Sequence, residues 1–279
     1  DLVLKGDAKC TTCHDEGDAP RILNIGKTRH GTIADKRVGT CTSCHGDSDK
    51  HIADAEKGSK PPTRPDVTFS RKSSTPVSAR NDACLTCHKG GSRMHWVSST
   101  HANRDVACSS CHSIHAATDK VRDKTTQAET CFACHKEQRT QINRPSHHPI
   151  PEGKMTCSDC HAVHGSVAAK LMKRDSVNDT CYTCHMEKRG PFVHNHEPVA
   201  EDCSNCHNPH GTVANNLLKQ PAAFLCLRCH AGHRGSSHTN IDQFKGLRPA
   251  LYTDCTQCHA QVHGGDLPSP TRRGSRLQR

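Results

Sequence analysis

The sequence predicts a mostly irregular chain with short α-helices and almost no β-structure. Hydrophobic residues make up 32% of the 279 residues and aromatic residues only 3%, whereas a typical globular domain has roughly 45–50% apolar residues. Glycine, proline, serine, asparagine and threonine fill the intervals between cysteine-containing segments, and they favour turns. Because so few apolar side chains cannot offset the conformational entropy of the chain, bound cofactors are expected to supply the core.

All 20 cysteines belong to one pattern, C-x-x-C-H, which occurs ten times. Two cysteines at this spacing can form thioether bonds with the vinyl groups of a haem, and the adjacent histidine can bind its iron. Zinc ribbons also use C-x-x-C pairs, and exported chains use cysteines in disulfides, but neither needs a histidine after every pair. The pattern therefore predicts ten covalently bound c-type haems, which form the core of a multihaem cytochrome.

The predicted thioether residues are Cys10, Cys13, Cys41, Cys44, Cys84, Cys87, Cys108, Cys111, Cys131, Cys134, Cys157, Cys160, Cys181, Cys184, Cys203, Cys206, Cys226, Cys229, Cys255 and Cys258. The histidine that ends each motif is the predicted proximal iron ligand: His14, His45, His88, His112, His135, His161, His185, His207, His230 and His259.

Fourteen histidines lie outside the motifs, which is more than enough for one distal ligand per haem. The predicted distal ligands are His30, His51, His101, His115, His148, His164, His196, His210, His238 and His263. Methionine ligation is not expected, because the sequence has only four methionines. All ten haems are therefore predicted to be low-spin, with two histidine ligands each.

Spacing divides the predicted distal ligands into two groups. Five of them, His51, His115, His164, His210 and His263, follow a proximal histidine by only three to six residues. At about 3.3–3.6 Å per residue, so short a segment cannot pass around a porphyrin edge. Each of these five should therefore bind a haem other than that of its own motif. The other five follow at longer intervals and could bind either their own haem or a neighbouring one.

In four places a second histidine lies close to the predicted distal ligand, so the choice is open. The alternatives are His95 or His101, His147 or His148, His194 or His196, and His233 or His238. The histidine that is not a ligand is expected to be a hydrogen-bonding partner or a surface residue.

The motifs recur with a two-motif period, which is typical of repeat architectures. Residues 108–115, 157–164 and 203–210 share the pattern C-x-x-C-H-x-x-H, and a second motif follows each. We therefore expect a single elongated domain over residues 1–279, built from two-haem units. Residues 46–83 are expected to form a long extended surface loop, with partner docking as the alternative, and residues 264–279 a flexible basic tail.

The formal net charge is +10, and a basic chain often binds nucleic acid or anionic membranes. Ten ferric haems with two histidine ligands each would carry about −10, however, which cancels this charge. Aromatic residues that could stack on bases are scarce, and no apolar run of about 18 residues is present to span a bilayer. We therefore expect neither nucleic-acid binding nor direct lipid contact.

An iron with two histidine ligands has no position for a substrate, so the predicted function is electron transfer and not catalysis. At roughly 5–10 Å per step, ten haems could extend over about 50–100 Å, more than the ~40–45 Å thickness of a bilayer with its headgroups. A polar chain of this kind would need a protein sheath such as a β-barrel. The alternatives are a soluble periplasmic electron shuttle and, with one five-coordinate haem, a multihaem oxyanion reductase.

Several segments carry a family resemblance: the ten motifs, the C-x-x-C-H-x-x-H-G units, and residues 87–91, 94–96 and 188–192. In these segments the chain resembles the MtrA-type decahaem cytochromes over nearly its whole length. The resemblance implies an exported protein with a cleaved signal peptide, located in the periplasm and inserted into an outer-membrane β-barrel porin. It also implies periplasmic electron-transfer cytochromes as partners, often an outer-surface multihaem cytochrome, and extracellular mineral or iron as the remote reactant. The direction of electron flow differs among members and stays open.

Overall fold

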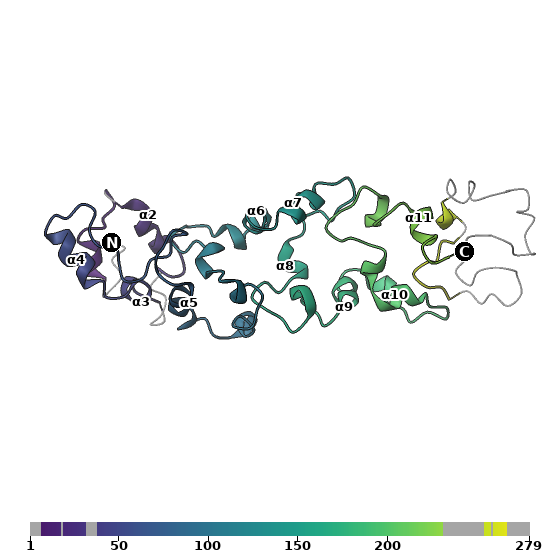
Figure 1. The fold of residues 1–279 in the computed structure, drawn as a ribbon, viewed down its shortest axis with the longest axis horizontal. Coiled ribbons are helices and arrows are strands. Elements are labelled where there is room, and N and C mark those ends of the chain that lie inside the picture. Colours follow the sequence, from purple (N-terminus) through teal and green to yellow (C-terminus); the bar gives the residue numbers. More distant parts are fainter. Residues whose placement is uncertain (1–6, 18, 32–37, 231–253, 258, 267–279) are drawn as a thin grey trace, which may run out of the picture. The chain divides into compact units, whose positions relative to one another are not determined.

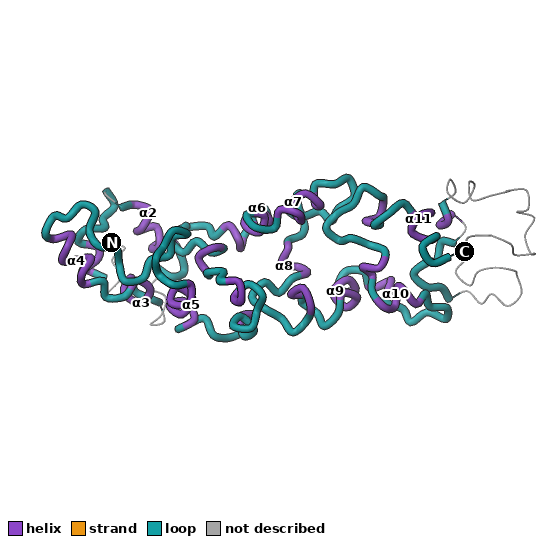
Figure 2. Tube along the Cα trace, in the orientation of Figure 1, coloured by secondary structure: helices purple, strands orange, loops and turns teal. Residues whose placement is uncertain are grey.

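The protein was analysed as a computed structural model, which describes residues 7–17, 19–31, 38–230, 254–257 and 259–266. Short helices alternate with irregular segments throughout these residues, as Figure 2 shows. They contain no strand, and only isolated bridges such as Ser146 with Thr212 join extended residues. The predicted fold class, a largely irregular chain with short helices, is confirmed.

The chain divides into two compact units. Unit 1 comprises Asp1–Cys131 and Ala162–Val167, and unit 2 comprises Phe132–His161 and Ala168–Arg279. The helices of unit 1 are α1 (Ala8–Thr11), α2 (Pro20–Leu23), η1 (Asn24–Lys27), α3 (Cys41–His45), α4 (Asp49–Glu56), α5 (Val77–Leu85), η2 (Gly91–Arg93), η3 (Ala102–Arg104), η4 (Cys108–Ser110) and η5 (Lys120–Arg122). The chain passes to unit 2 within α6 (Gln127–Phe132).

Unit 2 has the same character, as Figure 1 shows for each labelled helix. Its helices are α7 (Lys136–Ile142), α8 (Cys157–Cys160), η6 (Ala169–Leu171), α9 (Val177–Tyr182), η7 (Met186–Lys188), α10 (Glu197–Glu201), η8 (Cys203–Asn205), η9 (Asn215–Leu217), α11 (Ala222–Cys226) and η11 (Cys255–Gln257). The described residues contain no helix that is long and apolar enough to cross a membrane.

Most motifs begin or end a single helical turn. In the motif at Cys181, the backbone N–H of His185 donates to the carbonyl of Cys181 at 2.9 Å, and the same bond recurs in most of the other motifs. Local capping fixes where some of these turns start. Thr40 and Ser43 exchange reciprocal hydrogen bonds at the start of α3, which satisfies N–H groups that have no partner within the helix. The turn brings both cysteines and the histidine of a motif close together.

The apolar core made by protein atoms is very small. In the residues that the structure describes, the buried apolar side chains are Trp96, Ala107, Phe132, Ile142 and Ala223. Large apolar side chains are exposed instead, including Val167 at 81% and Val213 at 77%, each three residues after a predicted distal histidine. Apolar surface left uncovered beside the predicted ligands is what a fold completed by porphyrin rings would show.

The structure describes one expected irregular segment in full and the start of another. Residues 46–83 are not one extended loop, because they contain α4 and most of α5. The sequence of α4 is rich in alanine and charged residues that tolerate a helix well, whereas the prolines that follow it favour an irregular segment. Of the expected tail 264–279, Gly265 is held by two backbone hydrogen bonds with His194 at 2.9 and 3.0 Å. Residues 267–279 lie outside the described residues.

Candidate functional site

Eight of the ten predicted proximal histidines lie opposite a predicted distal histidine, with ring centroids 5.9–6.3 Å apart. In unit 1 the pairs are His14–His51, His30–His88, His45–His115 and His112–His164. In unit 2 they are His148–His185, His161–His210, His196–His230 and His207–His263. Two metal–nitrogen bonds of about 2.0 Å and two ring radii of about 1.2 Å give about 6.4 Å between centroids. Each gap therefore fits one metal ion bound by both imidazoles.

The pairs follow a regular offset along the chain. A histidine that closely follows an even-numbered motif lies opposite the proximal histidine two motifs earlier, as His210 does with His161. A histidine that follows an odd-numbered motif lies opposite the proximal histidine two motifs later, as His148 does with His185. His51 is an exception, since it faces His14 one motif earlier. In none of these eight pairs do both rings come from the same motif and its following segment.

The second nitrogen of eight predicted ligands has a fixed backbone hydrogen-bond acceptor. Nδ1 of His45, His51, His101, His115, His148, His161, His196 and His207 lies 2.6–3.0 Å from a backbone carbonyl oxygen. A proton on Nδ1 leaves the Nε2 lone pair available to a metal. The protein therefore fixes both the tautomer and the orientation of these rings.

His112 is the exception, because its Nδ1 lies 2.7 Å from Oδ2 of Asp119. A carboxylate acceptor gives the imidazole more anionic character than a carbonyl does, and this makes it a stronger ligand for ferric iron. Asp119 was not singled out from the sequence. Carboxylates are common on protein surfaces, and its distance of seven residues from His112 follows no familiar motif.

Replacing Asp119 with asparagine is expected to raise the reduction potential of a single haem by about 60 mV, the equivalent of a tenfold change for a one-electron couple. Asparagine still accepts the Nδ1 proton but removes the negative charge. A spectroelectrochemical titration would show the shift. Asp123→Asn is the matched control, because that carboxylate bonds Thr125 and not a histidine. Identical titration curves for both variants would contradict the role of Asp119.

Burial favours the neutral form of several of these imidazoles. It lowers the pKa of His45, His88, His164, His207, His210 and His263 below the ordinary value, because the charged form loses hydration. Neutral imidazole is the form that binds a metal. The site environment therefore favours the ligating state of these rings.

The structure also places the alternative histidines. His148 faces His185, whereas His147 bonds the carbonyl of Arg144 and lies 3.1 Å from Oε1 of Glu152. These two acceptors raise the pKa of His147. His196 faces His230, whereas His194 pairs through its backbone with Gly265.

The carbonyl of His95 lies against Gly165, and Nδ1 of His101 lies 2.9 Å from the carbonyl of Val163. His135 directly precedes α7, and the N–H of His259 donates to the carbonyl of Cys255 at 2.8 Å. His233, His238 and Cys258 lie outside the described residues.

The cysteines place successive motifs next to each other within each unit. The thiols of the first cysteines interact in Cys10–Cys41, Cys84–Cys108, Cys181–Cys203 and Cys226–Cys255. The second cysteines lie close enough to interact electrostatically in Cys44–Cys87, Cys160–Cys184 and Cys206–Cys229. These two kinds of contact alternate, so motifs that are neighbours in sequence are also neighbours in space.

Glycine follows three of the predicted distal histidines, and the structure gives the reason. Gly165, Gly211 and Gly264 have φ values of +118°, +145° and +134°. A Cβ atom would lie 2.3 Å from the carbonyl oxygen of His95 at Gly165, and 2.1 Å from that of Gln141 at Gly211. The H-G pair is visible in the sequence, but the backbone that crowds each glycine comes from a distant segment.

Replacing Gly211 with alanine is expected to destabilise the protein by about 3 kcal/mol and to displace His210 from its position opposite His161. The reason is that the added Cβ would meet the backbone carbonyl of Gln141, which cannot rotate away as a side chain could. Thermal unfolding and the low-spin haem spectrum would report both effects. Gly90→Ala is the control, since Gly90 has φ −112° and open space around it. Equal behaviour of the two variants would contradict this account.

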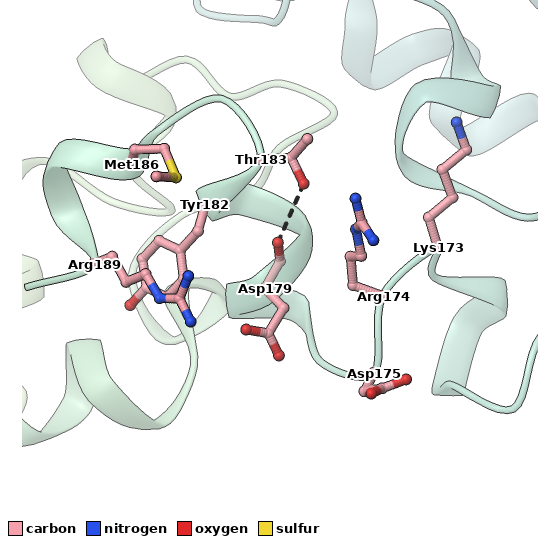
Figure 3. A pocket seen from close by; sticks show the side chains of 8 residues that line it. All are labelled: Lys173, Arg174, Asp175, Asp179, Tyr182, Thr183, Met186 and Arg189. Atoms are coloured by element: carbon pink, nitrogen blue, oxygen red, sulfur yellow. Dashed lines mark hydrogen bonds between the residues drawn. The ribbon is translucent and has the colours of Figure 1, made fainter.

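A cavity of about 640 Å³ lies beside the seventh motif. Figure 3 shows its lining residues: Lys173, Arg174, Asp175, Asp179, Tyr182, Thr183, Met186 and Arg189. Tyr182 and Thr183 stand between the two cysteines of that motif, and Met186 follows its histidine. The cavity is therefore part of the surroundings of a predicted haem attachment site.

Family comparisons agree with this geometry. A family described as doubled CXXCH motif matches residues 147–190 and 196–235, and a family described as cytochrome c-type protein NrfB-like matches residues 41–125. Together with the motifs and the paired rings, these matches define a multihaem c-type cytochrome, which binds haem c at its C-x-x-C-H motifs and carries electrons.

The chain is 40% identical to the multiheme cytochrome MtrA of Shewanella baltica, over 99% of this chain and 82% of the relative. It is 28% identical to cytochrome c-type protein NrfB of Escherichia coli over 49% of this chain and 69% of the relative. The corresponding values for NrfB of Haemophilus influenzae are 29%, 47% and 65%. The chain therefore belongs to the MtrA family of multihaem cytochromes, which confirms the predicted resemblance. It is an electron carrier and not an enzyme.

Proposed function

We propose that the chain binds ten haem c groups, each with its iron between two histidines, and conducts electrons across the outer membrane inside a β-barrel porin. The observation that carries this proposal is the set of eight histidine pairs with ring centroids 5.9–6.3 Å apart. When bound, haem supplies reversible one-electron chemistry at iron. Two protein ligands per iron leave no position for a substrate, which favours electron transfer over catalysis.

The proposed ligands are the ten motif histidines and the ten distal histidines predicted from the sequence. Eight of each meet in the pairs described above, and His101 and His238 complete the distal set. In most pairs the two histidines come from motifs that are two apart in the sequence. Each haem would therefore join two separated parts of the chain. Holding a cofactor from both sides in this way fixes its position, and a fixed position keeps the distances between successive redox centres constant.

The alternating cysteine contacts support a continuous path within each unit. Because every thioether bond anchors a haem edge at its cysteine, motifs with neighbouring cysteines would hold neighbouring haems. The path would follow sequence order, from the motif at Cys10 to that at Cys108 in unit 1, and from Cys157 to Cys255 in unit 2. Each electron-transfer step would then join two neighbouring haems, with no long step through protein between distant cofactors.

The location follows from the chemistry of attachment and of the surface. Haem c is attached outside the bacterial inner membrane, so we place the chain in the periplasm and at the outer membrane after export. A chain in which 24% of the residues are charged cannot face lipid, whereas a large β-barrel has a polar interior. Periplasmic cytochromes would be the partners at one end, and an outer-surface multihaem cytochrome or extracellular iron at the other.

The test is reconstitution of the purified holoprotein with its candidate barrel in liposomes that enclose a reduced redox dye. The proposal predicts a stable complex and oxidation of the enclosed dye by an external acceptor that cannot cross the bilayer. Liposomes with the barrel alone, or with the holoprotein added outside, should show no oxidation. If the holoprotein does not associate with the barrel and remains a monomer, the soluble periplasmic shuttle replaces the conduit.

A further inference from the structure

A buried polar side chain stands three residues before the first cysteine of three odd-numbered motifs. These residues are Asp7, Asn81 and Asn178, which precede Cys10, Cys84 and Cys181. Their exposed fractions are 0%, 8% and 7%. A polar group at such low exposure needs a hydrogen-bonding partner to offset its loss of hydration.

In all three cases the partner is the first cysteine of the next motif. Oδ1 of Asp7 accepts a hydrogen bond from the backbone N–H of Cys41 at 2.8 Å. Oδ1 of Asn81 accepts from Cys108 at 2.8 Å, and Oδ1 of Asn178 accepts from Cys203 at 2.7 Å. Each of these N–H groups begins a helical turn and has no acceptor inside that turn. The buried side chain therefore caps a helix that belongs to the neighbouring motif.

The two asparagines hold the neighbouring segment at a second point. Nδ2 of Asn81 donates to the carbonyl of Val106 at 3.2 Å. Nδ2 of Asn178 donates to the carbonyls of Val199 and Ala200 at 2.9 and 3.1 Å. Both polar atoms of the buried amide are hydrogen-bonded to the neighbouring segment. Neither the asparagine nor that segment can therefore shift without losing hydrogen bonds.

The segments held by these hydrogen bonds carry haem attachment points. In each of these three motif pairs, the thiols of the two first cysteines interact: Cys10 with Cys41, Cys84 with Cys108, and Cys181 with Cys203. The side chain thus fixes the backbone of one attachment cysteine against the helical turn that bears the other. These hydrogen bonds therefore join the two segments that carry the attachment points.

Alanine occupies the same position in the other two odd-numbered motifs, as Ala128 before Cys131 and Ala223 before Cys226. Ala223 is buried like the asparagines but has no polar side-chain atom to offer to the motif at Cys255. The buried polar side chain is therefore not required for every motif pair, which indicates a specific role where it is present.

We propose that Asp7, Asn81 and Asn178 are positioning residues for electron transfer, which set the separation and hence the electronic coupling of the two haems in their pairs. This inference rests on the proposed haem set, because it concerns the spacing of haems attached at known cysteines. It adds a role for residues that are neither thioether residues nor iron ligands.

The test uses three variants of the holoprotein without a barrel. Asn178→Ala reproduces Ala223 and removes the contact with Cys203. Asn178→Asp keeps the acceptor for Cys203 but replaces the Nδ2 donor with a carboxylate oxygen that faces the carbonyls of Val199 and Ala200. Thr180→Val is the matched control, since Thr180 lies in the same helix α9 with 7% exposure and its hydroxyl bonds only the carbonyl of Ser176 in its own turn. Haem content is measured for each variant, together with magnetic coupling by pulsed EPR and intramolecular electron transfer after flash reduction.

Asn178→Ala is expected to keep its haems but to slow electron transfer at least about tenfold and to weaken one coupled EPR signal. Asn178→Asp should also slow electron transfer, because the segment loses both hydrogen bonds donated by Nδ2, whereas Thr180→Val should retain the parent rate. An unchanged rate and coupling in Asn178→Ala would overturn the inference. If Asn178→Ala loses a haem, Asn178→Asp decides, because the parent rate and coupling in that variant would also overturn the inference. Failure of the proposed haem set would appear separately, as fewer than ten haems or high-spin iron in the parent protein.

Discussion

Replacing His148 with alanine is expected to convert one low-spin haem iron to high spin, whereas replacing the adjacent His147 leaves the spectrum unchanged. The ring of His148 lies 6.3 Å from that of His185, and its Nδ1 is held 2.8 Å from the carbonyl of Pro209. Its Nε2 is therefore the group available to an iron bound by His185. Alanine would leave that iron with one protein ligand and an open position.

His147 is the matched control because it is the same residue type one position earlier. Its ring nitrogens bond the carbonyl of Arg144 and Glu152, so it has no lone pair directed at a motif. Low-temperature EPR of the oxidised protein would show a high-spin signal for His148→Ala, and added cyanide should return it to low spin. A high-spin signal from His147→Ala, or its absence from His148→Ala, would contradict the ligand assignment.

The chain made without haem attachment is expected to be unfolded. Its described residues bury only five apolar side chains, so protein contacts alone cannot offset the conformational entropy of the chain. A single structural metal can contribute about 10 kcal/mol to folding, against a total stability of about 5–15 kcal/mol for a typical domain. The free energy of folding lost with all the iron–histidine bonds would therefore exceed the stability that protein contacts alone provide.

Far-UV circular dichroism and amide hydrogen exchange would test this expectation on reduced chain produced in the cytoplasm, where haem c is not attached. The matured holoprotein of identical sequence is the control, and it should show a cooperative thermal transition and protected amides. Protected amides and a cooperative transition in the haem-free chain would show that the protein has a sufficient core of its own.

Local features of the fold could be predicted from the sequence because local residues determine them. The motif spacing fixes one helical turn at each C-x-x-C-H, and turn-forming residues between motifs exclude long helices and strands. The short spacing after His161 also excluded His164 as a ligand within its own motif, and the structure places His164 opposite His112. Helix α4 was missed because the prolines of residues 46–83 received more weight than the helix-forming residues ahead of them.

The pairing of histidines could not be predicted, because it depends on how distant segments pass one another. His30 and His196 follow their motifs at intervals long enough to return to the same haem, and only the fold places them opposite His88 and His230. The glycines after the distal histidines have the same explanation, whereas Asp119 lies only seven residues from His112, at a spacing that follows no familiar motif. Asn81 and Asn178 differ, since both precede a motif by three residues within a repeating pattern and could have been found by aligning the repeats.

The most direct test of the central claim, ten irons with two histidine ligands each, is near-infrared magnetic circular dichroism of the oxidised holoprotein, which reports the axial ligand pair of each low-spin haem. The account predicts a single type of charge-transfer band, at the position of histidine–histidine ligation, with the intensity of ten irons per chain. A band from histidine–methionine ligation, a high-spin contribution, or an intensity below ten irons would contradict it.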